Sequence, residues 1–215
     1  MASVDALPLA SFRLFYLKGR GPAELVRYLL AYSGRLFEDC RLTLDQWRHI
    51  RGQDKRIVLP LLEVDGQEVL SGAVPIALYL AQKLGLAGGS ESEWRAVAAL
   101  VAAVGELQTA LAPVVRAVLA RQELKRKLEW SLFAHHHLNP FLDHAEARLS
   151  HQDAWLVGET VTVADVAVGE LLGRVSECFE SHALRAHPSL KSLVQRVEAL
   201  PGIADWVATR PHSLF

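Results

Sequence analysis

The chain has 215 residues, with 23 lysines and arginines, 24 aspartates and glutamates, and 2 cysteines. This length allows one large domain or two small ones, and either can bury a core without a stabilising metal or disulfide. Because the charges nearly cancel, nucleic acid or an anionic membrane is not expected as a main partner. Cys40 and Cys178 form no C-x-x-C pair, which argues against a disulfide framework and against dithiol redox chemistry.

The first ten residues contain neither a basic n-region nor a long apolar core. No later apolar run is expected to reach the roughly 18 residues of a membrane span. We therefore expect a soluble protein in the reducing cytoplasm that acts on small molecules or contacts other proteins.

The first elements alternate between strand and helix. Phe12–Tyr16 and Leu36–Arg41 are β-rich runs on either side of the helical pattern Ala23–Tyr32. Short connections and the right-handed crossover rule predict a β-α-β opening with two parallel strands.

A hairpin and a helix are predicted next. The runs 61–64 and 67–70 are joined by Asp65-Gly66, a dipeptide that tolerates the positive φ angles of a two-residue hairpin turn. A helix over about 74–84 closes this unit, and the glycines of segment 85–90 are typical of a linker. We place a domain boundary there.

The rest of the chain has helical spacing and no hairpin signal. Residues 91–149 predict two long helices separated near 120–123. The segment Thr162-Val-Ala-Asp165 predicts a capping box at the start of a buried helix. Pro188 and Pro201 are expected in the first turns of two short closing helices, where a missing N–H is tolerated.

Tyr16 stands at the predicted carboxyl end of the first strand, before a glycine turn and a helix. Ligands collect outside the carboxyl ends of such strands and near helix N-termini, where backbone N–H groups favour anions. A phenol at this place is able to hold an anion. Taken alone, however, the segment favours a tyrosine that merely ends a buried strand.

The whole pattern after about Ser11 resembles the cytosolic glutathione transferases, and most closely their sigma class. The matching motifs are Asp45-Gln-Trp-Arg48, Leu59-Pro-Leu-Leu-Glu-Val-Asp-Gly66, Ile76-Ala-Leu-Tyr-Leu-Ala81, Thr160-Val-Thr-Val-Ala-Asp165 and Trp206-Val-Ala-Thr-Arg-Pro211. The resemblance implies a thioredoxin-like α/β domain at 11–84, a linker at 85–90 and an all-helical domain at 91–215.

The resemblance also implies chemistry. Tyr16 would donate a hydrogen bond to the sulfur of glutathione, which stabilises the thiolate and lowers the thiol pKa. Leu59 would pair through its main chain with the cysteinyl part of glutathione, and Pro60 would follow a cis peptide bond. Trp47 would contact the glycine end and Arg51 the terminal carboxylate, although rim packing and an ordinary surface charge are the alternatives for these two.

The second half would supply a shared site and a substrate pocket. Glu106 matches an acidic position that reaches the partner's glutathione in a homodimer, but alone it would be a solvated helix residue. Leu17, Pro113 and Phe215 would line a pocket for an apolar electrophile. The implied reaction is thiolate addition or substitution in detoxification, with isomerisation of a prostaglandin-like endoperoxide as a variant.

The chain departs from the family where the γ-glutamyl carboxylate should bind. Gly72 and Ala73 stand where the family has Gln or Glu followed by Ser, with Ser71 as a possible substitute hydroxyl if the loop is shifted. Pro22 replaces an arginine beside the tyrosine, and Val58 replaces a polar residue before Leu59. A non-catalytic protein that keeps the fold and an apolar groove is therefore the alternative.

The run His135-His136-His137 does not predict a metal site. Successive helical residues point about 100° apart and cannot converge on one ion. No metal cofactor is therefore expected, and glutathione is the expected co-substrate.

Overall fold

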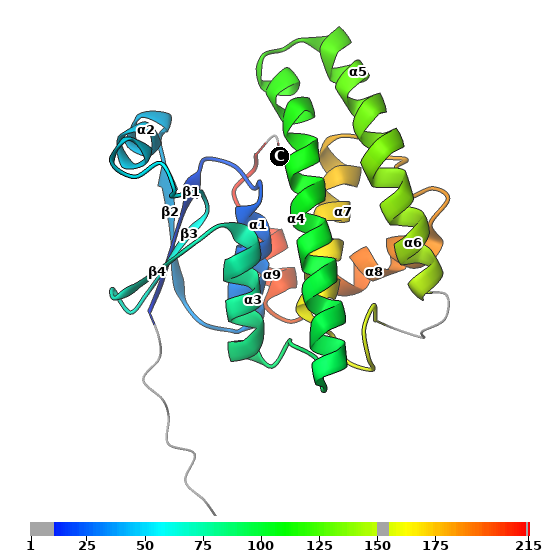
Figure 1. Cartoon of the computed structure of the whole chain (residues 1–215), viewed down its shortest axis with the longest axis horizontal. Coiled ribbons are helices and arrows are strands. Elements are labelled where there is room, and N and C mark those ends of the chain that lie inside the picture. Colours follow the sequence, from blue (N-terminus) through cyan, green and yellow to red (C-terminus); the bar gives the residue numbers. More distant parts are fainter. Residues whose placement is uncertain (1–10, 150–154, 214) are drawn as a thin grey trace, which may run out of the picture.

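The computed structural model describes residues 11–149, 155–213 and 215. Figure 1 shows the small sheet and its adjoining helices at the left of the molecule and the larger array of helices at the right. This arrangement is the predicted one, an α/β thioredoxin-like unit followed by helices.

The sheet has four strands in the order β2-β1-β3-β4. β1 and β2 are parallel, and β3 is antiparallel to both β1 and β4. The strands are β1 (Phe12–Leu17), β2 (Phe37–Leu42), β3 (Leu61–Val64) and β4 (Glu68–Ser71). The β-α-β opening is confirmed, and β2 begins one residue later than expected, at Phe37, because that residue pairs with Phe12 at the start of β1.

The β3–β4 hairpin is confirmed, but its turn is longer than predicted. Val64 pairs with Glu68, which leaves three residues in the loop instead of two. Asp65 and Gly66 both have positive φ, 54° and 66°, as the sequence indicated. The additional residue is Gln67, whose N–H donates to the carbonyl of Val64 at 3.1 Å.

Three helices accompany the sheet: α1 (Ala23–Tyr32), α2 (Leu44–Gln53) and α3 (Ala73–Leu84). α1 is buried from Ala23 to Leu30, whereas α2 has no buried residue and lies beside the sheet, apart from the other helices (Figure 1). A capping box between Thr43 and Gln46 holds the start of α2.

The second part of the chain is helical. Its elements are α4 (Glu91–Leu119), α5 (Glu123–Phe133), the π-helical turn η1 (Ala134–Leu138), α6 (Asn139–Leu149), α7 (Val163–Cys178), α8 (Pro188–Glu198) and α9 (Ile203–Thr209). The predicted break near 120–123 is confirmed, and Pro188 lies in the first turn of α8 as expected. Pro201 does not lie in a first turn, because α9 begins only after Gly202 at its N-cap. The three consecutive histidines lie in η1.

α7 is the central helix of this part, and every residue from Val163 to Val175 is buried. Its predicted start is confirmed: the carboxylate of Asp165 accepts from the N–H and from the hydroxyl of Thr162, both at 2.8 Å. The same carboxylate accepts from the N–H of Leu156 at 2.7 Å, so one buried side chain holds both the helix and the preceding loop.

α4 is long and apolar enough to cross a membrane by length and composition, which we did not expect from the sequence. Many of its apolar residues nevertheless pack inside the protein. Eight of them are buried, and α4 contacts α3, α5 and α7. This is the behaviour of a core helix, so its apolar character reflects its position between the two parts of the chain.

Candidate functional site

Tyr16 lies near the carboxyl end of β1, the central strand beside β3. In the β1–β3 register Phe15 is opposite Leu61, so Tyr16 follows the last paired residue of β1 and Pro60 precedes the first residue of β3. Gly21, with φ of 47°, lies directly against the tyrosine: a Cβ added there would be 2.3 Å from the Tyr16 hydroxyl oxygen. The turn after β1 thus requires glycine at the point where it passes the phenol.

The phenol is half-buried, and no described residue shares a hydrogen bond with its hydroxyl. Burial raises the pKa of Tyr16 above 10, while Arg174 and Arg27 act in the opposite direction. The phenol therefore stays protonated at neutral pH. It is a hydrogen-bond donor available to a ligand.

The segment before β3 adopts the backbone that the family resemblance implied. The Leu59–Pro60 peptide bond is cis, and Pro60 is buried. Val58 is exposed, but its main chain is fixed: its N–H donates to the Ser71 hydroxyl at 3.0 Å, and that hydroxyl donates to the Val58 carbonyl at 2.8 Å. Ser71 is therefore bound to this segment and does not replace the hydroxyl missing from Ala73.

The start of α3 lies next to the same segment. Gly72 is the N-cap residue with φ of 90°, and its N–H donates to the carbonyl of Pro60 at 2.8 Å. Pro75 has no N–H, and the N–H groups of Ala73 and Val74 have no partner among the described residues. Two backbone donors and the positive end of the helix dipole are thus available to an anion.

Trp47 and Arg51 lie one turn apart on α2. The guanidinium carbon of Arg51 is 6.0 Å from the centre of the Trp47 ring, and the tryptophan is half-buried while the arginine is exposed. The structure brings these two predicted residues together. Neither makes a contact with Tyr16 that the structure records, so their roles stay predictions.

Glu106 is exposed on α4, beside a close contact between α4 and α3. A Cβ at the neighbouring Gly105 would be 2.6 Å from a methyl group of Val74, in the first turn of α3. Glycine at position 105 lets the two helices approach. Glu106 is the next residue along α4 from this contact.

The three predicted pocket residues lie in different segments of the chain. Leu17 ends β1, Pro113 lies within α4, and the main-chain oxygen of Phe215 accepts from the N–H of Arg20 at 2.9 Å. Phe215 thus lies beside the turn that follows Tyr16. Its ring stacks on Phe179, with centroids 6.0 Å apart.

Sequence reasoning missed the aromatic residues that continue this contact. The ring of Phe179 stacks on Trp130 at 6.3 Å and an interplanar angle of 3°. Phe179 follows α7 and Trp130 lies on α5, so the pairing depends on tertiary packing between segments far apart in the sequence. No local sequence pattern indicates such a contact.

Sequence reasoning also missed a group of buried charges between the two parts of the chain. On α1, the carboxylate of Glu24 accepts hydrogen bonds from Trp206 Nε1 at 2.9 Å and from Arg210 at 3.1 Å. Arg27, on the same helix, forms ion pairs with Glu24 at 3.1 Å and with Asp39 at 3.0 Å. The one local signal for this charged group was the pair Glu24 and Arg27, which stand three residues apart within an otherwise apolar helix.

A second buried pair lies on α7. Arg174 donates to Glu170 at 2.7 Å, and both side chains are almost fully buried. Burial raises the pKa of Glu170, which Arg174 counteracts. The two members of this pair act on the pKa of Tyr16 in opposite directions: Arg174 lowers it and Glu170 raises it.

A protonated phenol at the end of β1, a cis-proline segment and the free amides of a helix start form a candidate ligand site on a thioredoxin-like fold with a helical part attached. Comparisons agree with this class. Residues 110–210 match the family model described as the C-terminal domain of glutathione S-transferase. Human hematopoietic prostaglandin D synthase is 30% identical over 207 residues, covering 95% of this chain and 99% of the relative.

Two nematode proteins are similarly related. Glutathione S-transferase 1 of Ascaris suum is 31% identical, covering 96% of this chain and 100% of the relative. The crystal structure of the glutathione S-transferase from Ascaris lumbricoides is 29% identical with a TM-score of 0.85, covering 95% of this chain and 100% of that one. The chain belongs to the glutathione transferase superfamily.

Proposed function

We propose that this protein is a sigma-like glutathione transferase that joins the thiolate of glutathione to apolar electrophiles. The observation that carries the proposal is the free, protonated hydroxyl of Tyr16, adjacent in register to the cis Leu59–Pro60 segment. Its relatives named glutathione S-transferase and prostaglandin D synthase support the same class.

In this proposal glutathione lies along the edge formed by Leu59. The main chain of Leu59 pairs with the cysteinyl residue, which directs the sulfur to Tyr16. The phenol donates a hydrogen bond to the thiolate and lowers the thiol pKa toward neutrality, without itself losing a proton. The thiolate then attacks the electrophile and forms a carbon–sulfur bond, and the thiol proton leaves to solvent.

The ends of the tripeptide are held by weaker contacts. The amides of Ala73 and Val74 bind the γ-glutamyl carboxylate through main chain alone, since neither side chain carries a hydroxyl. Trp47 and Arg51 contact the glycine end. Glu106 binds the γ-glutamyl ammonium of the partner's glutathione in a homodimer.

The electrophile lies between the domain proposed for residues 11–84 and the helical domain after the 85–90 linker. Leu17, Pro113 and Phe215 line this pocket, and Phe179 extends it. An endoperoxide related to prostaglandins is a second substrate class, because a relative is a prostaglandin D synthase. We place the protein in the cytoplasm, with detoxification as its role.

Calorimetric titration of glutathione in two buffers of different ionisation enthalpy tests the proposal. Saturable binding with proton release is expected if the site ionises the thiol. Tyr16→Phe should then bind glutathione with much less proton release and should lose about 30- to 1000-fold in kcat/KM, the usual effect of removing one such donor. Tyr32→Phe, at the far end of α1, is the control.

The second candidate is a non-catalytic binding protein on the same fold. It is favoured by one observation, the engagement of Ser71 with Val58, which leaves the carboxylate position without any hydroxyl. Ala73→Ser restores that hydroxyl and leaves Gly72, whose φ of 90° disfavours a side chain, unchanged. Two results would favour this candidate. One is that the Ala73→Ser variant binds glutathione and the parent chain does not, and the other is that Ala73→Ser still shows no turnover.

A further inference from the structure

The outer face of α5 carries a row of exposed leucines. Leu124, Leu128 and Leu132 are 86%, 60% and 46% exposed, and they stand four residues apart, so this leucine row shares one face of the helix. Leu119, the last residue of α4, is 63% exposed just before the connection that leads into α5. Of the eight large apolar side chains that are exposed in the part of the chain that the structure describes, four therefore lie within residues 119–132.

The leucine row does not belong to the buried core of the protein. The inner face of α5 fills that role: Phe133 is buried, and the ring of Trp130 lies 5.7 Å from that of Phe133 and 6.3 Å from that of Phe179. A surface helix normally places polar residues opposite such an inner face. α5 is apolar on both faces instead, which indicates that its outer face contacts something outside the protein.

The leucine row is flanked by cations. Lys125 follows Leu124 and Lys127 precedes Leu128, so at about 100° per residue the two lysines lie on opposite sides of the row. Both lysines are exposed, and so is Arg121 in the connection between α4 and α5. None of these three side chains forms an ion pair or a hydrogen bond with a residue that the structure describes. Their charges are thus available to an external anion.

The local charge of this surface is positive, although the net charge of the whole chain is -1. Residues 119–133 contain four cations and two carboxylates. One of the carboxylates, Glu123, is already paired with Arg126 at 2.8 Å, and Glu129 is the other. The charge balance of the whole chain led us to expect no membrane partner, but that balance averages over this segment. Locally, a positive and apolar surface is complementary to an anionic lipid membrane.

The position of α5 leaves this surface accessible. α5 lies along the border of the helical array in Figure 1, and its connection to α4 forms the upper end of the molecule. A flat and deformable surface can approach a projecting helix without a matching hollow. A second copy of this chain fits less well, because two identical faces would bring their cations together.

We propose that the outer face of α5 docks the protein on anionic phospholipid membranes. The leucine row and Leu119 enter the boundary between headgroups and acyl chains, as in helices that lie in the plane of a membrane. Lys125 and Lys127 extend their alkyl stems along this boundary and, with Arg121, bind the lipid phosphates. Each contribution alone is weak, so the binding needs both and is reversible. It does not involve glutathione, and it holds equally for a catalytic and a non-catalytic protein.

Co-sedimentation of the full chain with lipid vesicles tests this proposal. The vesicles contain phosphatidylcholine alone or phosphatidylcholine mixed with phosphatidylserine, at about 0.1 M salt. We expect saturable binding to the mixed vesicles, little binding to phosphatidylcholine alone, and weaker binding as the salt concentration rises. Lys125→Ala/Lys127→Ala should bind the mixed vesicles at least about tenfold more weakly, the effect expected for two lysines near an anionic surface. Leu124→Ser/Leu128→Ser should also lose at least about tenfold, because two inserted side chains are removed.

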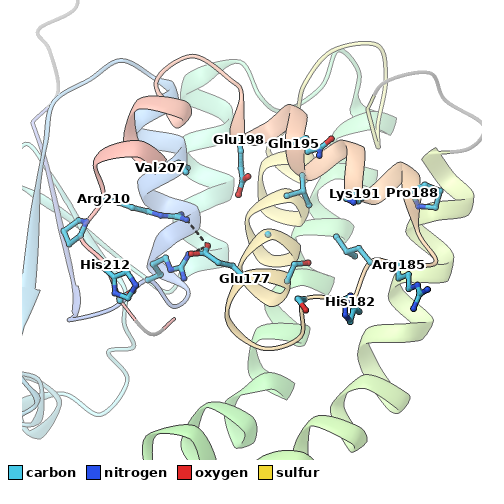
Figure 2. A pocket seen from close by; sticks show the side chains of 18 residues that line it. Glu177, His182, Arg185, Pro188, Lys191, Gln195, Glu198, Val207, Arg210 and His212 are labelled. Carbon is cyan, nitrogen blue, oxygen red and sulfur yellow. Dashed lines mark hydrogen bonds and ion pairs between the residues drawn. The ribbon is translucent and has the colours of Figure 1, made fainter.

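The matched control for charge is Arg185→Ala/Lys191→Ala. Both cations are exposed, but they line a cavity between the end of α7 and α8 (Figure 2), where no exposed large apolar side chain accompanies them among the described residues. The matched control for apolar surface is Leu36→Ser/Val69→Ser. These two side chains are exposed singly, one before β2 and one on β4, at opposite edges of the sheet. Both controls should bind the mixed vesicles as tightly as the parent chain.

Three results of the vesicle experiment would overturn the proposal: no binding to the mixed vesicles, equal binding to both kinds of vesicle, or equal losses in a variant and its control. Sedimentation equilibrium without lipid examines a second copy as the occupant. If Leu124→Ser/Leu128→Ser dissociates an oligomer that the parent chain forms, a second copy covers this face and the proposal fails. The variants change exposed side chains alone, so loss of the fold does not account for a loss of binding.

Discussion

Gly21 and the hydroxyl of Tyr16 occupy adjoining space, since a Cβ at Gly21 would be 2.3 Å from the phenol oxygen. The turn therefore determines where the phenol can stand. A side chain at position 21 and the observed position of Tyr16 are mutually exclusive.

Gly21→Ala should displace the Tyr16 hydroxyl and reduce kcat/KM for glutathione and 1-chloro-2,4-dinitrobenzene by about tenfold or more, because the donor is misplaced. Gly34→Ala is the matched control. It has a similar positive φ, 66° against 47°, but no atom lies within 4 Å of its added Cβ. Both variants carry the backbone strain, so an equal loss of activity in the two would contradict the steric explanation.

Ser71→Ala should weaken glutathione binding, because the two hydrogen bonds that hold the Val58 main chain beside Leu59 are lost. We expect about a five- to tenfold rise in KM with little change in kcat, since one side-chain hydrogen bond contributes about 1 kcal/mol. Ser71→Thr keeps the hydroxyl and should restore KM. An unchanged KM in Ser71→Ala would show that the segment is held by other contacts.

Arg174→Met should destabilise the fold by about 3–5 kcal/mol, because it leaves Glu170 buried without its partner. In the folded state the pKa of Glu170 is already raised by burial, and loss of Arg174 removes the opposing effect. The variant should therefore be most stable at low pH and lose stability as the pH rises through the folded pKa. Urea unfolding at several pH values measures this, and Glu170→Leu/Arg174→Met should recover most of the loss.

The carboxylate of Glu146 gives the opposite pH dependence. Burial would raise its pKa, but the N–H groups of Ser189 and Leu190, both donating at 2.9 Å, hold the pKa of Glu146 below its ordinary 4.5. The stability that this cap of α8 provides is thus present above the ordinary pKa and is lost as the pH falls through the lower folded value.

Glu146→Gln should accordingly lose about 0.5–1 kcal/mol of unfolding free energy at neutral pH, within the usual range for a helix cap. Its difference from the parent chain should shrink as the pH falls from about 6 to about 3. Glu129→Gln, on α5, is the control. A difference that stays constant with pH would contradict a charge-dependent cap.

The sequence predicted most elements, because each depended on a local signal. The Asp65-Gly66 turn, the Thr162–Asp165 cap and the proline at the start of α8 all act within a few residues. Pro201 was misplaced because a proline before a glycine N-cap carries the same local signal as one in the first turn. The boundary at 85–90 stays a prediction.

The residues of the candidate site likewise fall into those that local motifs predicted and those that they did not. Tyr16 and the cis Leu59–Pro60 bond followed from family motifs, and the structure places them in adjacent register. The Ser71–Val58 hydrogen bonds, the Phe179–Phe215 stacking and the burial of Arg174 depend on segments brought together by packing. A single sequence has no periodicity that reports such contacts.

The bonds from Trp206 and Arg210 to Glu24 join positions that are 182 and 186 residues apart. Residues 11–84 contain the complete sheet and its helices, yet expressed as a fragment they would lose both of these donors and leave Glu24 with Arg27 as its partner. The same holds for attempts to exchange this unit between relatives. A chimaera built at the 85–90 segment needs the last helix from the same parent as the first, so that the pair is transplanted together.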